Sequence, residues 1–191
     1  MKKTLFSLAP LALILMGCSE PEPADKKSIE NYELVAEAEQ RLDIYTPYQL
    51  KTDLSHLSDD QKKMVSLLID ASEIMDNLFW QQAFPGNKES LLSSVEGDVR
   101  EFTAINYGPW DRLNNNKPFL TGFEEKPEGA NFYPADMSKT EFENADLADK
   151  DSLYTLLRRD EQDELITVPY SEAFKDSLTR ASDILLEAAD L

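Results

Sequence analysis

The middle of the sequence, residues 105–137, limits the possible folds of this chain most, because it has neither the 3.6-residue period of a helix nor the alternation of a strand. Glycines and prolines, which interrupt regular structure, recur along it at Gly108, Pro109, Pro118, Gly122, Pro127, Gly129 and Pro134. Irregular segments of this length are usually either functional or disordered. The segment also carries many large apolar side chains, which argue against disorder: Tyr107, Trp110, Phe119, Phe123, Phe132 and Tyr133. We therefore expect an ordered loop that packs against other parts of the molecule.

Helices are expected before this loop. Apolar residues at spacings of three and four occur from Asn31 to the Thr46-Pro47 step, over residues 59–82, and in shorter pieces around residues 88–95 and 99–105. The long helix begins with a capping-box pattern, in which Ser58 would accept a hydrogen bond from the third helical amide and Gln61 would reach back. Residues 48–54 are expected to be short and extended.

A hairpin and a final helix are expected after the loop. Ser138 and Glu141 form a second capping-box pattern that opens a short helix. Residues 152–159 and 164–168 are rich in strand-forming residues and flank a charged turn. The last helix carries apolar residues on one face: Phe174, Leu178, Ala181, Ile184, Leu185 and Ala188. The expected fold class is α+β, mostly helical with one β-hairpin and a long ordered loop.

This fold is expected to be part of a larger one. A two-stranded hairpin is marginal in water unless further strands or a helix pack on it, and the sequence has no other clear strand pattern. The sequence also stops on the apolar Leu191, without a glycine cap or a basic last turn. Both features favour a polypeptide that is interrupted inside a domain.

The N-terminus has the pattern of a secretory signal. Lys2 and Lys3 precede an apolar run, residues 5–16, that is too short to span a bilayer permanently. The run ends at Leu15-Met16-Gly17-Cys18, which resembles a bacterial lipobox. An ordinary signal with a chance cysteine is the alternative. We expect residues 1–17 to be a lipoprotein signal peptide and residues 18–30 to be a flexible tether.

Lipidation of Cys18 would anchor the protein in a membrane, since several acyl chains bind a bilayer stably where a single one does not. Cys18 is the only cysteine of the chain, so it has no intramolecular disulfide partner. Ser19 in the next position resembles lipoproteins that are sent to the outer membrane. The expected location is the cell envelope, facing the periplasm if the cell is Gram-negative.

The strong negative charge excludes some partners. Loss of residues 1–17 removes two lysines and no acid, so the formal charge changes from −18 to −20. Such a surface repels nucleic acid, whose binding depends on basic residues, and disfavours direct contact with anionic lipid. Solubility is the simplest meaning of the charge, and an acidic binding face is the alternative. No nucleic-acid partner is expected.

Catalytic motifs are absent from the sequence. His56 is the only histidine and is expected in a loop or at the start of a helix, so the clustered imidazoles or thiolates of a catalytic zinc site are not available. There is no G-x-S-x-G elbow, P-loop or dinucleotide-binding glycine pattern. Asp146, Asp149 and Asp151 lack the glycine and the spacing of a calcium loop. With 37 acidic residues, a carboxylate pair of the glycosidase kind has no specific signal.

The aromatic and amide-rich stretch of residues 105–119 is what remains as a candidate binding site. Amide side chains and rigid aromatic rings could bind an extended peptide or a sugar. Alternatively, Trp110 and its neighbours fill the core, Asp111 and Arg112 make local hydrogen bonds, and residues 114–116 form a turn.

Four stretches resemble the N-terminal region of bacterial zinc peptidases of the dipeptidyl peptidase III family. They are LSHLSDDQKKMVSLLIDASEIMDNLFWQQAF, INYGPWDRLNNNKPF, EKPEGANFYPADMSKTEF and SLYTLLRRDEQDELITVPYSEAF, and the resemblance runs from about Tyr48 to the end. It implies a longer protein with two lobes around a wide cleft. A helical lobe would carry the metal, the other lobe would have a β-barrel core, and substrate peptides would lie between them.

The family's zinc motif, H-E-x-x-x-H or H-E-x-x-H with a downstream glutamate, has no counterpart here. No catalytic or metal-binding residue is therefore assigned, no cofactor is expected in this chain, and zinc is implied only for the full-length family. Activity of this chain alone is not expected. The resemblance implies possible cleft or substrate contacts at six residues: Tyr107, Trp110, Asp111, Arg112, Asn131 and Tyr133.

Three functions remain open from the sequence. The first is the noncatalytic N-terminal part of a membrane-anchored, dipeptidyl peptidase III-like zinc peptidase, whose partners would be the remainder of the peptidase fold and a peptide substrate. The second is a complete small cell-envelope lipoprotein that binds a peptide, a glycan or a partner protein through the loop around Trp110. The third is a standalone hydrolase that uses carboxylates.

Overall fold

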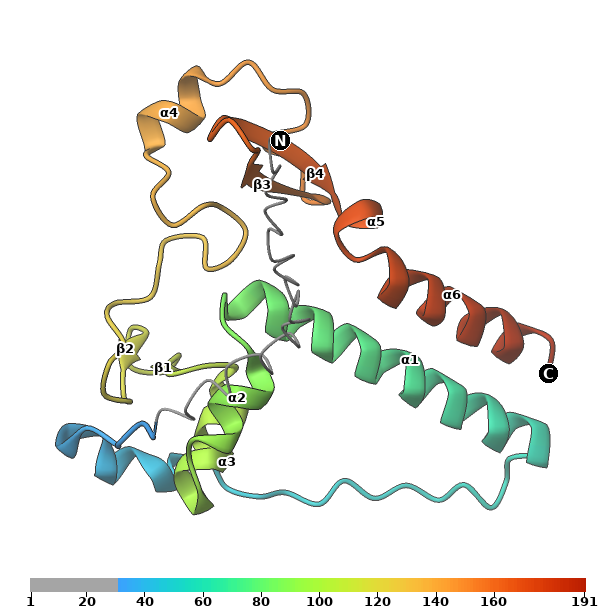
Figure 1. Cartoon of the computed structure of the whole chain (residues 1–191). Helices are drawn as coiled ribbons and strands as arrows, with labels where there is room; N and C mark the ends of the chain where they lie inside the picture. The colour runs from blue at the N-terminus through green and yellow to red at the C-terminus, as the bar shows by residue number, and fades with distance from the viewer. Residues whose placement is uncertain (1–30) are drawn as a thin grey trace, which may run out of the picture.

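The structure is a computed structural model that describes residues 31–191. The expected signal peptide, the tether and the lipidated Cys18 lie outside the described residues. The described part is α+β, as expected, with helices that are separated from a C-terminal hairpin by a long irregular stretch (Figure 1). Its elements in chain order are η1 (Ala36–Ile44), α1 (Asp59–Ala83), α2 (Lys88–Ser93), α3 (Gly97–Asn106), β1 (Trp110–Asp111), β2 (Lys117–Pro118), α4 (Lys139–Asn144), β3 (Thr155–Arg159), β4 (Leu165–Pro169), α5 (Tyr170–Ala173) and α6 (Lys175–Ala189).

Helix α1 begins where its cap predicts. The Ser58 hydroxyl accepts from the Gln61 amide at 3.2 Å, and the Gln61 side chain accepts from the Ser58 amide at 3.0 Å, so both halves of the capping box are present. The helix ends at Ala83, just before Pro85, which disfavours the helical conformation of the residue that precedes it. The local sequence therefore defines both ends of this helix.

The first helix is shorter than predicted. It is a 3-10 helix that begins at Ala36 instead of Asn31, because the preceding residues pair with the loop. The Val35 amide donates to the Phe119 carbonyl at 2.9 Å, and Leu34 forms an isolated antiparallel bridge with Leu120. This pairing joins residues far apart in the sequence, so the periodicity of residues 31–35 could not show it.

The long irregular stretch is ordered and forms much of the main core. It contains a two-residue antiparallel ladder, β1 with β2, in addition to the one predicted hairpin. Phe119 and Leu120 are almost fully buried. They join a cluster that also includes Ala38 of η1, Trp80 of α1, Leu91 of α2, Phe102 of α3 and Trp110 of β1, together with Phe84 and Val95 from the connections between the helices.

The predicted hairpin is formed by β3 and β4, with Leu157 opposite Thr167 in the antiparallel register. Its first strand begins at Thr155, later than the predicted residue 152, because Ser152 closes a turn by donating its amide to the Asp149 carbonyl. Leu156 packs with Leu78 of α1 and with Phe174 in a second, smaller core. Helices therefore supply part of the packing that an isolated hairpin lacks.

Helix α6 lies along α1 and runs in the opposite direction (Figure 1). Ala71 and Ala181 are buried, and the Lys63 ammonium lies 3.0 Å from the Glu187 carboxylate at the far end of the pair. Large apolar side chains remain exposed on both helices, namely Leu68, Ile69, Met75 and Phe79 on α1 and Leu185 and Leu186 on α6. We call these six residues the exposed apolar set.

The segment that joins η1 to α1 is extended, as predicted for residues 48–54. All of residues 46–56 are exposed, including Tyr48, Leu50 and the single histidine, His56. In Figure 1 this segment is a long extended trace from η1 to the start of α1. It carries three exposed large apolar side chains, Tyr48, Leu50 and Leu54.

Candidate functional site

The six residues that the sequence predicts as cleft or substrate contacts lie in two separate places. Tyr107, Trp110, Asp111 and Arg112 surround the end of α3 and strand β1. Asn131 and Tyr133 line a pocket beside the β3–β4 hairpin. The six residues therefore belong to two separate candidate sites.

Tyr107 ends α3 in the left-handed conformation, with φ of 55°. Its hydroxyl donates to the Asp76 carboxylate, and its ring packs edge-on against Phe79 with the centroids 4.6 Å apart. The bond to Asp76 and partial burial raise the pKa of the Tyr107 hydroxyl. The exposed Arg112 lies over the same ring at 5.4 Å and donates to the Ile105 carbonyl at 2.6 Å. Tyr107 and Arg112 thus form one partly exposed cluster.

Trp110 and Asp111 point into the core instead of toward solvent. The Trp110 side chain packs against Phe84 and Phe123, and its indole N–H donates to the Glu124 carbonyl at 2.9 Å. The Asp111 carboxylate is buried and accepts from the Arg41 Nε at 2.8 Å. This bond raises the pKa of the Arg41 guanidinium. Both side chains already have partners within the described fold.

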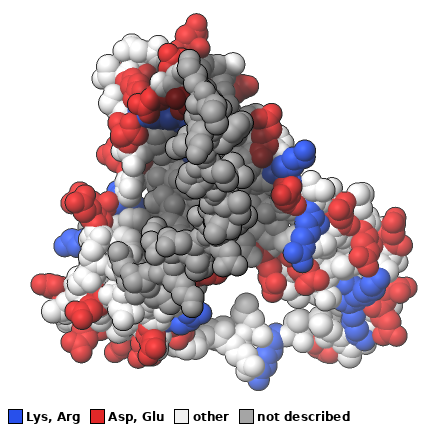
Figure 2. All heavy atoms as spheres, in the orientation of Figure 1, with Lys and Arg blue, Asp and Glu red and all other residues white. Residues whose placement is uncertain are grey.

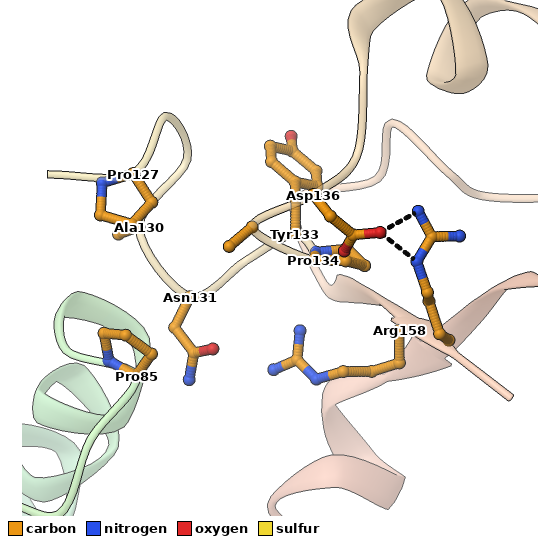
Figure 3. A pocket seen from close by; sticks show the side chains of 10 residues that line it. Pro85, Pro127, Ala130, Asn131, Tyr133, Pro134, Asp136 and Arg158 are labelled. Atoms are coloured by element: carbon orange, nitrogen blue, oxygen red, sulfur yellow. Dashed lines mark hydrogen bonds and ion pairs between the residues drawn. The ribbon is translucent and has the colours of Figure 1, made fainter. Parts of the chain in front are cut away.

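The pocket beside the hairpin has a volume of about 300 Å³ and lies between the end of α1, the irregular stretch and β3 (Figure 3). Three prolines, Tyr133 and two alanines make most of its wall. Asn131 is held by two hydrogen bonds to the end of α1, from its backbone amide to the Gln82 carbonyl at 3.0 Å and from its side-chain amide to the Gln81 carbonyl at 2.7 Å. Asn131 and Tyr133 were both predicted from the sequence as contacts, but only the folded chain shows that they share a pocket.

Arg158 is the functional candidate that sequence reasoning missed. Its side chain extends into the pocket toward Asn131 (Figure 3). Nη1 donates to the Leu157 carbonyl at 2.7 Å and approaches the Phe132 carbonyl at 3.4 Å. No carboxylate among residues 31–191 forms an ion pair with it, and burial lowers the pKa of its guanidinium. The only sequence signal was an arginine pair, Arg158-Arg159, at the end of an apolar strand.

Arg159 also lines this pocket, but its guanidinium is fully paired. Its guanidinium contacts the Asp136 carboxylate at 2.7 Å and the Glu141 carboxylate at 2.9 Å. Arg159 lowers the pKa of both carboxyl groups. Glu141 therefore does not complete the predicted second capping box, of which only the bond from the Glu141 amide to the Ser138 hydroxyl forms, at 3.1 Å.

A second pocket, of about 550 Å³, adjoins the first and shares Pro127 and Ala130 with it. Lys117 and Lys126 both line it, and the Lys126 ammonium lies 5.7 Å from the centre of the Trp110 ring. Burial lowers the pKa of Lys126. The asparagine pair Asn115 and Asn116 lies at its edge in the left-handed conformation, with φ of 55° at both residues.

The donor set for a metal is not present in the described part of the chain. Within residues 31–191, no three His, Cys, Asp or Glu side chains come together in a way that could hold a metal ion. The zinc implied by the resemblance therefore does not fit residues 31–191, and we derive no catalytic step through it. None of the helices over the same range is both long enough and apolar enough to cross a bilayer.

Acidic side chains are spread over η1, α4 and the α1–α6 pair on the face shown in Figure 2, with basic side chains between them on α1 and α6. The formal charge of the chain is −18. Charges of both signs that alternate on a helix pair favour a solvated surface.

Comparison with known proteins shows that this fold is similar to part of a peptidase. The solved structure of dipeptidyl-peptidase III from Corallococcus sp. strain EGB matches 77% of this chain with a TM-score of 0.68 and 33% sequence identity. Nudix hydrolase 3 of Arabidopsis thaliana is 27% identical over 215 aligned positions, which cover 80% of this chain. The chain spans only 30% of the length of the first protein and 28% of the second. No family model matches the sequence. The chain thus has a fold like part of dipeptidyl-peptidase III and is related to hydrolases.

Proposed function

We propose that this chain supplies the noncatalytic N-terminal part of a dipeptidyl-peptidase III-like zinc hydrolase that acts on peptides. The observation that carries the proposal is the match to the Corallococcus structure, which includes most of the described residues and extends to sequence as well as fold. Because the chain spans less than a third of that protein, the zinc ligands and the catalytic groups would lie in the rest of the enzyme.

The surface of the described residues supports this role. Exposed apolar patches on a soluble protein often mark surfaces that bind other protein. The exposed apolar set of α1 and α6 includes Leu186, which is 63% exposed, and the extended segment of residues 46–56 exposes Tyr48 and Leu50. In the proposed enzyme, the remainder of the peptidase fold would cover these side chains.

The proposed enzyme is anchored in the cell envelope. The support is the sequence around Cys18, where a short apolar run ends at a lipobox-like step and the sole cysteine of the chain follows. The charged and proline-rich residues 19–28 would hold the folded part away from the membrane. In a Gram-negative cell the anchor would lie in the outer membrane and the protein would face the periplasm.

The test is to express, in its native host, the longest reading frame that contains codons 1–191 and to separate membranes from soluble protein. We expect release of dipeptides from a peptide panel in the membrane fraction, with loss on chelation and recovery on addition of zinc. The matched variant Cys18→Ser should move this activity to the soluble fraction. Residues 19–191 expressed alone should release no dipeptide.

Two results would contradict the proposal. One is zinc-dependent dipeptide release by residues 19–191 alone, which would place the catalytic groups within this chain. The other is a longest reading frame whose product is stable and shows no dipeptide release with or without zinc.

A further inference from the structure

The pocket beside the hairpin has the features of a binding site for an apolar ligand that carries one charged group. Prolines make its wall at three points, Pro85, Pro127 and Pro134, and Tyr133 adds an aromatic surface (Figure 3). Prolines have few backbone conformations, so the pocket loses little entropy when a ligand enters. Binding sites of this kind combine apolar walls with a few placed polar groups.

The polar groups of the pocket leave one positive charge free to bind. Asp136 lines the pocket, but its carboxylate is bound to Arg159 and so is not available to neutralise Arg158. The two carbonyl contacts of Arg158 use only Nη1. Its Nε and Nη2 donors have no acceptor among residues 31–191. Arg100, Arg112 and Arg180 also lack a carboxylate partner among residues 31–191, but all three are exposed, whereas Arg158 is half-buried and lines the pocket.

The remaining donors of Arg158 match a carboxylate. A guanidinium offers two parallel N–H groups in a plane, which bind both oxygens of a carboxylate at once. The carbonyl of Leu157 holds the Arg158 side chain in place through Nη1. Asn131 lies opposite Arg158, and one of its two side-chain N–H groups donates to the Gln81 carbonyl (Figure 3). Its oxygen accepts no hydrogen bond from residues 31–191 and can accept a ligand N–H.

We propose that this pocket binds the carboxylate of a short peptide, with Arg158 as its anchor. The ligand carboxylate would receive two hydrogen bonds from Arg158, and its neighbouring apolar side chain would lie on the prolines and Tyr133. A backbone N–H of the peptide would donate to the Asn131 oxygen. All of these groups belong to residues 31–191, so the site does not depend on zinc or on the proposed peptidase activity.

The test uses the full chain labelled with nitrogen-15, followed by NMR during titration. The probes are N-acetyl-Ala-Phe with a free carboxylate and the same peptide with a carboxamide end. We expect the free acid to shift the Arg158 Nε–H resonance, and the carboxamide to bind about 10- to 100-fold more weakly, since one charged hydrogen-bonded contact is lost. A third probe, N-acetyl-Phe-Glu-amide, has its only carboxylate in the side chain. Its binding shows whether the pocket accepts the carboxylate of an acidic side chain or only that of a peptide C-terminus.

Variants separate binding from folding. Arg158→Gln should weaken binding of the free-acid peptide by a similar factor, and Arg158→Lys should keep part of the affinity. The control Arg180→Gln, which removes an exposed arginine on α6, should leave the affinity for the peptide unchanged. If Arg158→Gln fails to fold, the difference in affinity of the unchanged chain for the free acid and for the carboxamide tests the proposal by itself. Equal binding of acid and carboxamide would overturn the proposal. So would unchanged binding by a folded Arg158→Gln protein, or displacement of the peptide by an equal concentration of inorganic phosphate.

Discussion

Replacement of Trp110 by alanine is expected to lower the free energy of unfolding by about 3 to 5 kcal/mol, the usual cost of removing a large buried aromatic side chain. The Trp110 side chain is central to the main core, and the residue is only 4% exposed. Phe84 and Phe123 pack on it, with ring centroids at 5.9 and 6.1 Å. The substitution would leave a cavity between them. It would also remove the donor to the Glu124 carbonyl.

Urea unfolding followed by circular dichroism measures this loss, since tryptophan fluorescence would change with the substitution itself. Trp110→Phe is the matched control, because it keeps an aromatic ring in the core and loses mainly the indole N–H. We expect it to cost clearly less than the alanine variant. A loss below about 1 kcal/mol for Trp110→Ala, which is typical of a surface position, would contradict the core role of this residue.

Leu157→Ala is expected to cost about 2 to 5 kcal/mol, the range for truncating a fully buried leucine. Leu157 is 0% exposed and lies in β3 opposite Thr167. Its amide also donates to the Phe132 carbonyl at 3.0 Å, which ties the hairpin to the irregular stretch. Loss of the side chain would remove the buried apolar contacts of β3, whereas this backbone hydrogen bond would remain.

The same stretch offers a matched control in Leu153, which is 84% exposed. Leu153→Ala should change the free energy of unfolding by no more than about 0.5 kcal/mol, as is usual for surface sites. Urea unfolding of both variants at one pH gives the comparison. Equal effects of the two substitutions would show that β3 is not packed as described.

The elements that the sequence predicted well are those whose signals are local. Helix α1 has its cap at Ser58 and Gln61, a steady apolar period, and a proline just after its end, so its bounds could be predicted to within a few residues. The hairpin could be recognised because strand-forming residues flank the charged residues 160–163. Each of these signals lies within a few positions of the element that it defines.

The features that the sequence did not predict depend on contacts between distant residues. Residues 33–35 pair with the loop around Phe119 and Leu120, so their helical spacing was misleading. Glu141 fits a capping box, but a tertiary ion pair with Arg159 takes its carboxylate.

The candidate site was predicted only in part for the same reason. Asn131 and Tyr133 were named from the resemblance, whereas Arg158 was not, because its sequence neighbour Arg159 is of the same type. Which arginine is neutralised depends on Asp136 and Glu141, which only the folded chain brings next to Arg159. The sequence alone could not distinguish the arginine whose guanidinium is paired with carboxylates from the one whose guanidinium is left open to the pocket.

We propose that the α1–α6 pair is one layer of a larger hydrolase-like fold and is held in place partly by protein beyond the described residues. Amide hydrogen exchange of the isolated chain, measured by mass spectrometry, tests it most directly. Helix α6 buries only Ala181 and Ala188 and exposes two leucines, whereas α3 buries Phe102, Thr103 and Asn106. We expect residues 175–189 to exchange at least about tenfold faster than residues 97–106, because local opening follows local packing. Equal protection of the two helices in the isolated chain would contradict it.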